Sequence, residues 1–162
     1  MTKKKLSVDP LKCTGCGLCE PACALFHTRT DDPKKSGIRI IPGGKDEEFF
    51  LPATCQHCEN PPCMAVCPED AIFRDRELDR VIIDKRKCIG CRMCVSACPT
   101  GAMDFDEDLG QAYKCDLCDG APECVRVCDV KAVDYVDGNM LNYHRMKESV
   151  APYFQMGRRL AT

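Results

Sequence analysis

Sixteen of the 162 residues are cysteine, and they fall into four groups of four along the chain. Every group opens with Cys-x-x-Cys and closes with Cys-x-x-x-Cys, and only the middle spacing varies. That spacing is two residues in the first and third groups, four in the second and five in the fourth. Repetition of this kind indicates one structural unit used four times. The groups are Cys13, Cys16, Cys19 and Cys23; Cys55, Cys58, Cys63 and Cys67; Cys88, Cys91, Cys94 and Cys98; and Cys115, Cys118, Cys124 and Cys128.

The N-terminal stretch helps to decide which chemistry these thiols serve. Met1-Thr-Lys-Lys-Lys runs into a polar segment and lacks the apolar region and cleavage site of a secretory signal. No segment approaches the roughly 18 apolar residues that span a bilayer. We therefore expect a cytoplasmic protein without membrane insertion, in a reducing compartment where thiols bind metals more often than they form disulfides. Export together with a partner that carries the signal is the alternative.

The compact triple Cys-x-x-Cys-x-x-Cys of the first and third groups favours iron-sulfur clusters over zinc. One tight loop of this spacing places three thiolates at three corners of a cubane, and the fourth corner comes from elsewhere in the chain. Two Cys-x-x-Cys pairs can instead form a tetrahedral zinc site, and the second and fourth groups come closest to that pattern. Because all sixteen cysteines divide into four sets of four, we predict four 4Fe-4S clusters. A zinc-binding structural protein is the alternative of a different class.

The residues after the closing cysteines suggest which groups exchange their fourth ligand. In two-cluster ferredoxins the closing cysteine of one motif, usually followed by proline, binds the other cluster. Proline follows Cys67 and Cys98, but not Cys23 or Cys128. This difference favours a nested exchange, second group with third and first with fourth, although adjacent pairing stays open. The nested sets are Cys13, Cys16, Cys19 with Cys128; Cys115, Cys118, Cys124 with Cys23; Cys55, Cys58, Cys63 with Cys98; and Cys88, Cys91, Cys94 with Cys67.

The segments around the cysteines predict an α+β fold. Short β-branched runs precede the first and third groups at residues 6–9 and 81–84, and each predicts a strand that leads into a ligand loop. Return strands are expected after three closing cysteines, from Ala71, Ala102 and Ala132. The three residues between the third and fourth cysteine of each group suit one helical turn. This order, strand, loop, short helix and strand, is the half-unit of a bacterial ferredoxin.

We therefore expect residues 1–162 to form a single polyferredoxin domain with two nested ferredoxin-like units. Residues 6–23 and 115–136 would form the outer unit, and residues 55–105 the inner one. The cysteine-free stretch 24–54 carries strong turn signals around Ile38-Arg-Ile-Ile, so we expect an inserted loop or hairpin there. Residues 138–162 form a C-terminal tail whose apolar residues have a loosely helical spacing, interrupted at Pro152. The tail either packs over the clusters or docks against another subunit.

Nothing else in the sequence predicts substrate chemistry. The formal net charge is −2 with both signs interleaved, which gives no nucleic-acid footprint. No phosphate-binding loop, catalytic triad or leftover cysteine is present, so catalysis would belong to a partner. His57 lies between two predicted ligands and would either donate a hydrogen bond to a cluster sulfur or bond to the backbone. His27 and His144 are expected to be plain surface residues.

Two stretches carry a resemblance to a known family. They are Thr54-Cys-Gln-His-Cys-Glu-Asn-Pro-Pro-Cys with the later Cys67-Pro68, and Cys88-Ile-Gly-Cys-Arg-Met-Cys with the later Cys98-Pro99. Both are similar to motifs of the dimethyl sulfoxide reductase iron-sulfur subunit family, whose members carry four clusters and serve molybdenum and tungsten pterin enzymes. The likeness covers roughly residues 6 to 136. Nested exchange is usual in that family, which supports it here.

The resemblance implies an electron-transfer subunit. It would relay electrons between the active site of a large catalytic subunit, with a tungsten or molybdenum pterin cofactor, and a further carrier such as ferredoxin or a flavin subunit. Many family members are longer, and the brevity of this chain looks most like the small subunits of aldehyde oxidoreductase-type tungsten enzymes. Service to a carbon monoxide dehydrogenase, a hydrogenase or a formate dehydrogenase is an alternative, as is a free polyferredoxin.

Overall fold

The structure is a computed structural model that describes residues 3–43, 49–138 and 140. Its elements are short, since loops that carry cysteines interrupt the chain at close intervals. The helices are α1 (Cys19–Thr28), η1 (Pro33–Lys35), α2 (Pro62–Ala65), α3 (Met93–Ala97), η2 (Leu117–Gly120) and α4 (Glu123–Arg126). The strands are β1 (Lys4–Val8), β2 (Ile38–Gly43), β3 (Phe49–Thr54), β4 (Ile72–Asp75), β5 (Arg80–Ile83), β6 (Met103–Asp106), β7 (Gln111–Lys114) and β8 (Val133–Asp137).

The strands of the described residues pair in four separate antiparallel sheets of two. β2 pairs with β3, β4 with β5 and β6 with β7, so three sheets join neighbours in the sequence. The fourth joins β1 to β8, from Lys4 opposite Asp137 to Val8 opposite Val133. The first and last strands of the described residues therefore lie side by side, which brings the first and fourth cysteine groups together.

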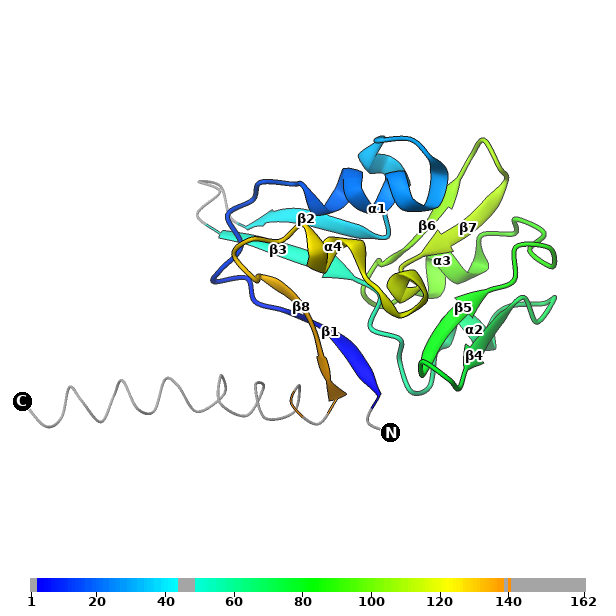
Figure 1. The fold of residues 1–162 in the computed structure, drawn as a ribbon. Coiled ribbons are helices and arrows are strands. Elements are labelled where there is room, and N and C mark those ends of the chain that lie inside the picture. Colours follow the sequence, from blue (N-terminus) through cyan, green and yellow to red (C-terminus); the bar gives the residue numbers. More distant parts are fainter. Residues whose placement is uncertain (1–2, 44–48, 139, 141–162) are drawn as a thin grey trace, which may run out of the picture.

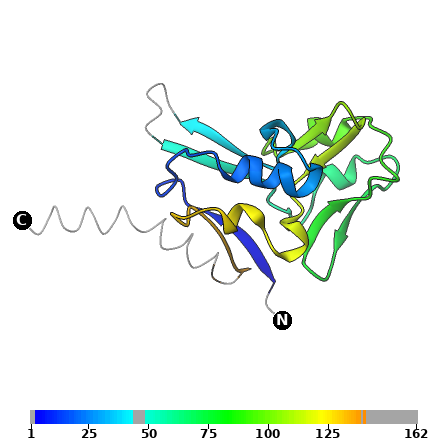
Figure 2. The same ribbon diagram turned by 45° about the horizontal axis from the view of Figure 1, so that its top comes forward.

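Figures 1 and 2 show these elements in two regions that lie next to each other. The outer region holds β1, β8, α1 and α4, with the β2–β3 pair beside them. The inner region, green in both views, holds β4 to β7 with α2 and α3. Each region contains two of the four cysteine groups, the first and fourth in the outer region and the second and third in the inner one.

Each region has its own apolar core, and cysteines belong to both. In the outer region Ile38 and Val133 are buried with Cys19, Cys23 and Cys124. In the inner region the buried cluster consists of Ile72, Val81, Cys94, Met103 and Ala112. These cores are small for a protein of this length, because much of the interior is given to the cysteine loops.

The four cysteine loops repeat one backbone geometry. The second residue after the first cysteine of every group has a positive φ: +71° at Gly15, +46° at His57, +74° at Gly90 and +65° at Leu117. A left-handed residue at this place turns the backbone sharply enough for successive amides to face inward. Glycine occupies the place in the first and third groups, whereas the second and fourth carry side chains there at a conformational cost.

The predicted local elements are found. Strands lie at both stretches expected before a cysteine group and at all three expected after one, and every group has helical residues between its third and fourth cysteines. Helix α1 runs beyond its cysteines to Thr28, so the first residues of the 24–54 stretch are helical. The helical tail proposed from residue 141 onward, and His144 within it, lie outside the described residues.

Candidate iron-sulfur sites

Three cavities of nearly equal size are each lined by four cysteines. Two enclose about 360 Å³ of empty space and the third about 330 Å³. In each of them, three cysteines come from the opening of one group and the fourth closes another group. The cysteine linings are Cys13, Cys16, Cys19 and Cys128; Cys55, Cys58, Cys63 and Cys98; and Cys88, Cys91, Cys94 and Cys67.

The remaining four cysteines lie together in the outer region. Cys23, Cys115, Cys118 and Cys124 are all buried. Burial raises the pKa of the Cys124 thiol well above its usual range, and the neighbouring Cys115, Cys23 and Cys118 thiolates raise it further. Four thiols that influence one another in this way are close enough to share one ligand set.

Backbone amides donate to three of the sulfurs. The Gly37 amide nitrogen lies 3.3 Å from Cys23 Sγ, the His57 nitrogen 3.4 Å from Cys55 Sγ, and the Ala71 nitrogen 3.3 Å from Cys67 Sγ. Amide donors stabilise negative charge on sulfur, so these loops suit thiolates better than thiols. Gly37 was seen in the sequence only as part of a turn. A Cβ there would stand 2.7 Å from the backbone nitrogen of Cys115, so only glycine fits.

Burial makes several thiols hard to ionise on their own. It raises the pKa of Cys19 and of Cys115 to about 12. A metal ligand must be a thiolate, so binding a metal here releases the protons that burial otherwise retains. The donor set is therefore adapted to bound metal, and thiolate is the ligand that 4Fe-4S clusters require.

His57 is held by the backbone of the inner region. Its Nδ1 accepts a hydrogen bond of 3.0 Å from the Val81 amide, and its side chain lines the cavity of Cys55, Cys58, Cys63 and Cys98. Burial lowers the pKa of His57 to about 3, and the positive charge of Lys114 adds to the effect. Its Nε2 is buried and has no partner among the described residues. The backbone bond predicted as one alternative is present, and Nε2 leaves the other alternative open.

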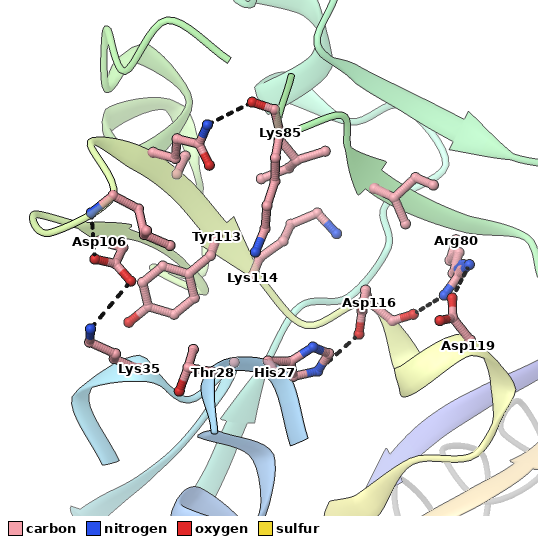
Figure 3. Close-up of a pocket in the computed structure, with 16 residues that line it drawn as sticks. His27, Thr28, Lys35, Arg80, Lys85, Asp106, Tyr113, Lys114, Asp116 and Asp119 are labelled. Carbon is pink, nitrogen blue, oxygen red and sulfur yellow. Dashed lines mark hydrogen bonds and ion pairs between the residues drawn. The ribbon is translucent and has the colours of Figure 1, made fainter. Parts of the chain in front are cut away.

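His27 is not the plain surface residue that the sequence suggested. Its Nε2 lies 3.6 Å from Cys118 Sγ and 3.3 Å from Asp116 Oδ1. Figure 3 shows it on the wall of a cavity between α1 and β7, with its ring turned toward Asp116. Hydrogen bonds with Cys118 and Cys23 raise the pKa of His27 to about 10. The signal was present in the sequence, because His27 follows Cys23 by four residues and so shares its helix face.

Two cysteine loops from different regions meet at the centre of the molecule. Thr54, the residue before Cys55, is buried and forms a hydrogen bond with Cys115, and the Cys55 thiolate contributes to the raised pKa of Cys115. Lys114, the residue before Cys115, lines the cavity of the Cys55 set. The Cys115 and Cys55 sets are therefore neighbours across the boundary between the outer and inner regions.

Comparison with known proteins defines the class. Residues 47–138 match the model of a 4Fe-4S dicluster domain family, and residues 12–71 match that of another 4Fe-4S dicluster domain family. The two matches together contain all four cysteine groups. This protein belongs to the 4Fe-4S dicluster proteins, and its cysteines therefore serve 4Fe-4S clusters and not structural zinc.

Three relatives are similar along most of their length. The Escherichia coli (strain K12) protein YsaA, whose name proposes an electron transport protein, is 38% identical over 86% of this chain and 94% of its own. The polyferredoxin-like subunit of aliphatic sulfonate oxidoreductase from Pyrococcus furiosus is 36% identical over 85% of this chain and 80% of its own. One subunit of anaerobic dimethyl sulfoxide reductase from Escherichia coli (strain K12) is 37% identical over 79% and 70%. The predicted resemblance to iron-sulfur subunits of oxidoreductases is confirmed.

Among solved structures, a component of the active site complex BamBC of benzoyl coenzyme A reductase shares the fold. It superposes with a TM-score of 0.50 and 24% identity, over 84% of this chain and 76% of its own length. Among the described residues, no helix is both long and apolar enough to cross a membrane.

Proposed function

We propose that this protein is an electron-transfer subunit with four 4Fe-4S clusters, which relays electrons between the active site of a partner oxidoreductase and an external carrier. The observation that carries the proposal is the set of three equal cavities, each lined by four cysteines, with a fourth set of buried cysteines beside them. Each bound cluster supplies one one-electron centre. The protein supplies the thiolates, the amide donors and the separation from water.

The ligands we propose follow the nested exchange. In the outer region Cys13, Cys16 and Cys19 take Cys128 as fourth ligand, and Cys115, Cys118 and Cys124 take Cys23. In the inner region Cys55, Cys58 and Cys63 take Cys98, and Cys88, Cys91 and Cys94 take Cys67. The linings of the three cavities support three of these sets, and the mutual influence of the buried thiols supports the fourth. Adjacent pairing would require cysteines from different cavities to share a cluster.

These sets define an order for electron transfer. The sets of Cys115 and Cys55 are neighbours across the boundary of the two regions, so they form the middle of the series. The set of Cys13 shares the outer region with the former, and the set of Cys88 shares the inner region with the latter. We therefore expect electrons to pass through the Cys13, Cys115, Cys55 and Cys88 sets in that order, or in reverse.

Both ends of this series reach the surface beside exposed apolar side chains. Cys16 and Cys91 are exposed, whereas all four cysteines of the Cys115 set are buried. Leu18 is 55% exposed near Cys16, and Ile89 and Met93 are 63% and 50% exposed on either side of Cys91. Exposed apolar groups at the edge of a redox centre suit transient docking. One end would face the catalytic subunit and the other the carrier.

The catalytic partner we propose is a large subunit with a tungsten or molybdenum pterin cofactor, of the aldehyde oxidoreductase type. The named oxidoreductases among the relatives support a catalytic partner of this general kind. A ferredoxin or a flavin subunit would serve as the second carrier, and the complex would reside in the cytoplasm. The resemblance to subunits of multi-protein enzymes favours this assignment over a free polyferredoxin.

Anaerobic purification of the native protein tests the proposal. We expect it to elute with a large pterin-containing subunit, and its clusters to be reduced when that subunit's substrate is added. A version that ends at Gly138 should keep its clusters, because no proposed ligand lies beyond Cys128, but should assemble less tightly. Elution as a lone monomer that passes electrons freely between unrelated enzymes would contradict the subunit assignment.

A further inference from the structure

His57 has a nitrogen that nothing in the described protein satisfies. The side chain is 4% exposed, and its Nε2 has no hydrogen-bond partner among the described residues. Leaving a buried polar group unpaired costs about 1–3 kcal/mol. Such a group in a folded protein needs an explanation, and a ligand that the protein is built to hold is one.

The hydrogen bond on the other nitrogen fixes which tautomer is present. The Val81 backbone N–H can only donate, so Nδ1 accepts its bond and carries no proton. The ring is therefore neutral, and its one N–H lies on Nε2. Since an N–H group is a donor, the missing partner must be an acceptor.

The surroundings identify that acceptor. His57 lines the cavity of Cys55, Cys58, Cys63 and Cys98, and its own amide already donates to Cys55 Sγ. The groups that a cluster brings into such a cavity are sulfides and thiolates, which are electron-rich acceptors. We propose that the His57 Nε2–H donates a hydrogen bond to a sulfur of the cluster in this cavity and raises its reduction potential above those of the two clusters at the ends of the series.

The repeat provides an internal comparison. The position that His57 occupies is held by Gly15, Gly90 and Leu117 in the other three groups, each with the same positive φ. None of those residues has a side-chain N–H, so this donor belongs to the second group alone. A left-handed backbone is unfavourable for a residue with a side chain, and here the strained residue holds the unpaired nitrogen.

The consequence for function is a step in the electron path, and it rests on the proposed function above. A donor to a cluster sulfur stabilises the extra electron of the reduced state. An electron that enters from either end would then be favoured on a central cluster. Because a hydrogen bond is worth about 1 kcal/mol, the reduction equilibrium should shift about tenfold, which equals 59 mV for one electron.

The test uses the full-length protein with its clusters and two matched variants. His57→Leu imports the residue that the fourth group carries at this place, and His57→Gln restores an N–H at a similar reach. Both lose the acceptor for the Val81 amide, so they differ chiefly in the donor. We expect a redox titration followed by electron paramagnetic resonance to show one cluster about tenfold harder to reduce in His57→Leu, with partial recovery in His57→Gln.

A second measurement needs no variant. In unmodified protein labelled with ¹⁵N-histidine, electron-nuclear double resonance should detect a histidine nitrogen coupled to the cluster whose signal Cys98→Ser alters. Equal potentials in both variants and the unmodified protein, or no ¹⁵N coupling to that cluster, would overturn the inference. Iron content separates this failure from that of the proposed function, since four intact clusters without the shift refute only the role of His57.

Discussion

The inner and outer regions contain the same repeated motif but close it in different ways. In the inner region β4 pairs with β5 and β6 with β7, so each sheet joins adjacent segments. In the outer region β1 pairs with β8, and two of the proposed cluster sites need both ends of the described residues. The inner region can therefore form early in folding, whereas the outer one waits for contacts distant in sequence. Damage to the outer region should spare the inner clusters more readily than the reverse.

The largest effect is expected from removing a closing cysteine from each region. Cys98→Ala should cost the cluster of Cys55, Cys58 and Cys63, because that site loses its fourth thiolate. Cys128→Ala is the matched change in the outer region and should cost the cluster of Cys13, Cys16 and Cys19. Each variant should fall from about sixteen irons toward about twelve, measured by iron analysis and spectroscopy. Loss of the Cys115 cluster in Cys98→Ala would support adjacent pairing instead.

A smaller effect, confined to the outer region, is expected from Gly37→Ala. The new Cβ would stand 2.7 Å from the Cys115 nitrogen, so the loop that donates to Cys23 Sγ must shift. We expect the cluster of the Cys115 set to become labile, with faster loss of its visible absorbance in air, and the inner clusters to persist.

Gly101→Ala is the control for this change. Gly101 has a φ of +64° but open space around its Cβ position, so alanine there meets only backbone strain of about 1 kcal/mol. Its clusters should decay at the rate of the unmodified protein. Equal lability in the two variants would show that any lost glycine loosens the clusters, and that the contact with Cys115 is unimportant.

The smallest effect is expected at the ion pairs that join the two regions. Lys5 of β1 donates to Asp79 Oδ2 over 2.9 Å, and Arg74 of β4 lies 2.8 Å from Oδ1 of the same carboxylate. The Lys5 hydrogen bond holds the pKa of Asp79 below its usual range. These groups are partly exposed, so Asp79→Asn should cost no more than about 1 kcal/mol and lower Tm by about 2–4 °C. Calorimetry tests the shift, and unchanged cluster potentials would show that the pair is only structural.

The sequence predicted the local structure well, because local signals determine it. Val81-Ile-Ile precedes the third group as a strand, and each pair of closing cysteines spans a helical turn, as their spacing indicated. The repeat itself was enough to indicate cubanes. By contrast, proline after Cys67 and Cys98 favoured one exchange without excluding the other, since the fourth ligand depends on which distant segments meet.

What the sequence could not predict lies in contacts between regions. The neighbourhood of Cys55 and Cys115, which orders the clusters, arises only when β3 and β7 end beside each other. Gly37 was indistinguishable from any turn glycine until its distance to Cys115 was known. The role of His27 was overlooked although its spacing from Cys23 was visible, because a lone exposed histidine is more often a surface residue.

The metal content of the protein, purified without oxygen, tests the central claim most directly. Four cubanes require about sixteen iron and about sixteen sulfide per molecule, no zinc, and a brown colour that bleaches on reduction. A value near twelve irons would mean that one cysteine group holds no cubane and would break the proposed series of four. A colourless protein with stoichiometric zinc would contradict the account as a whole.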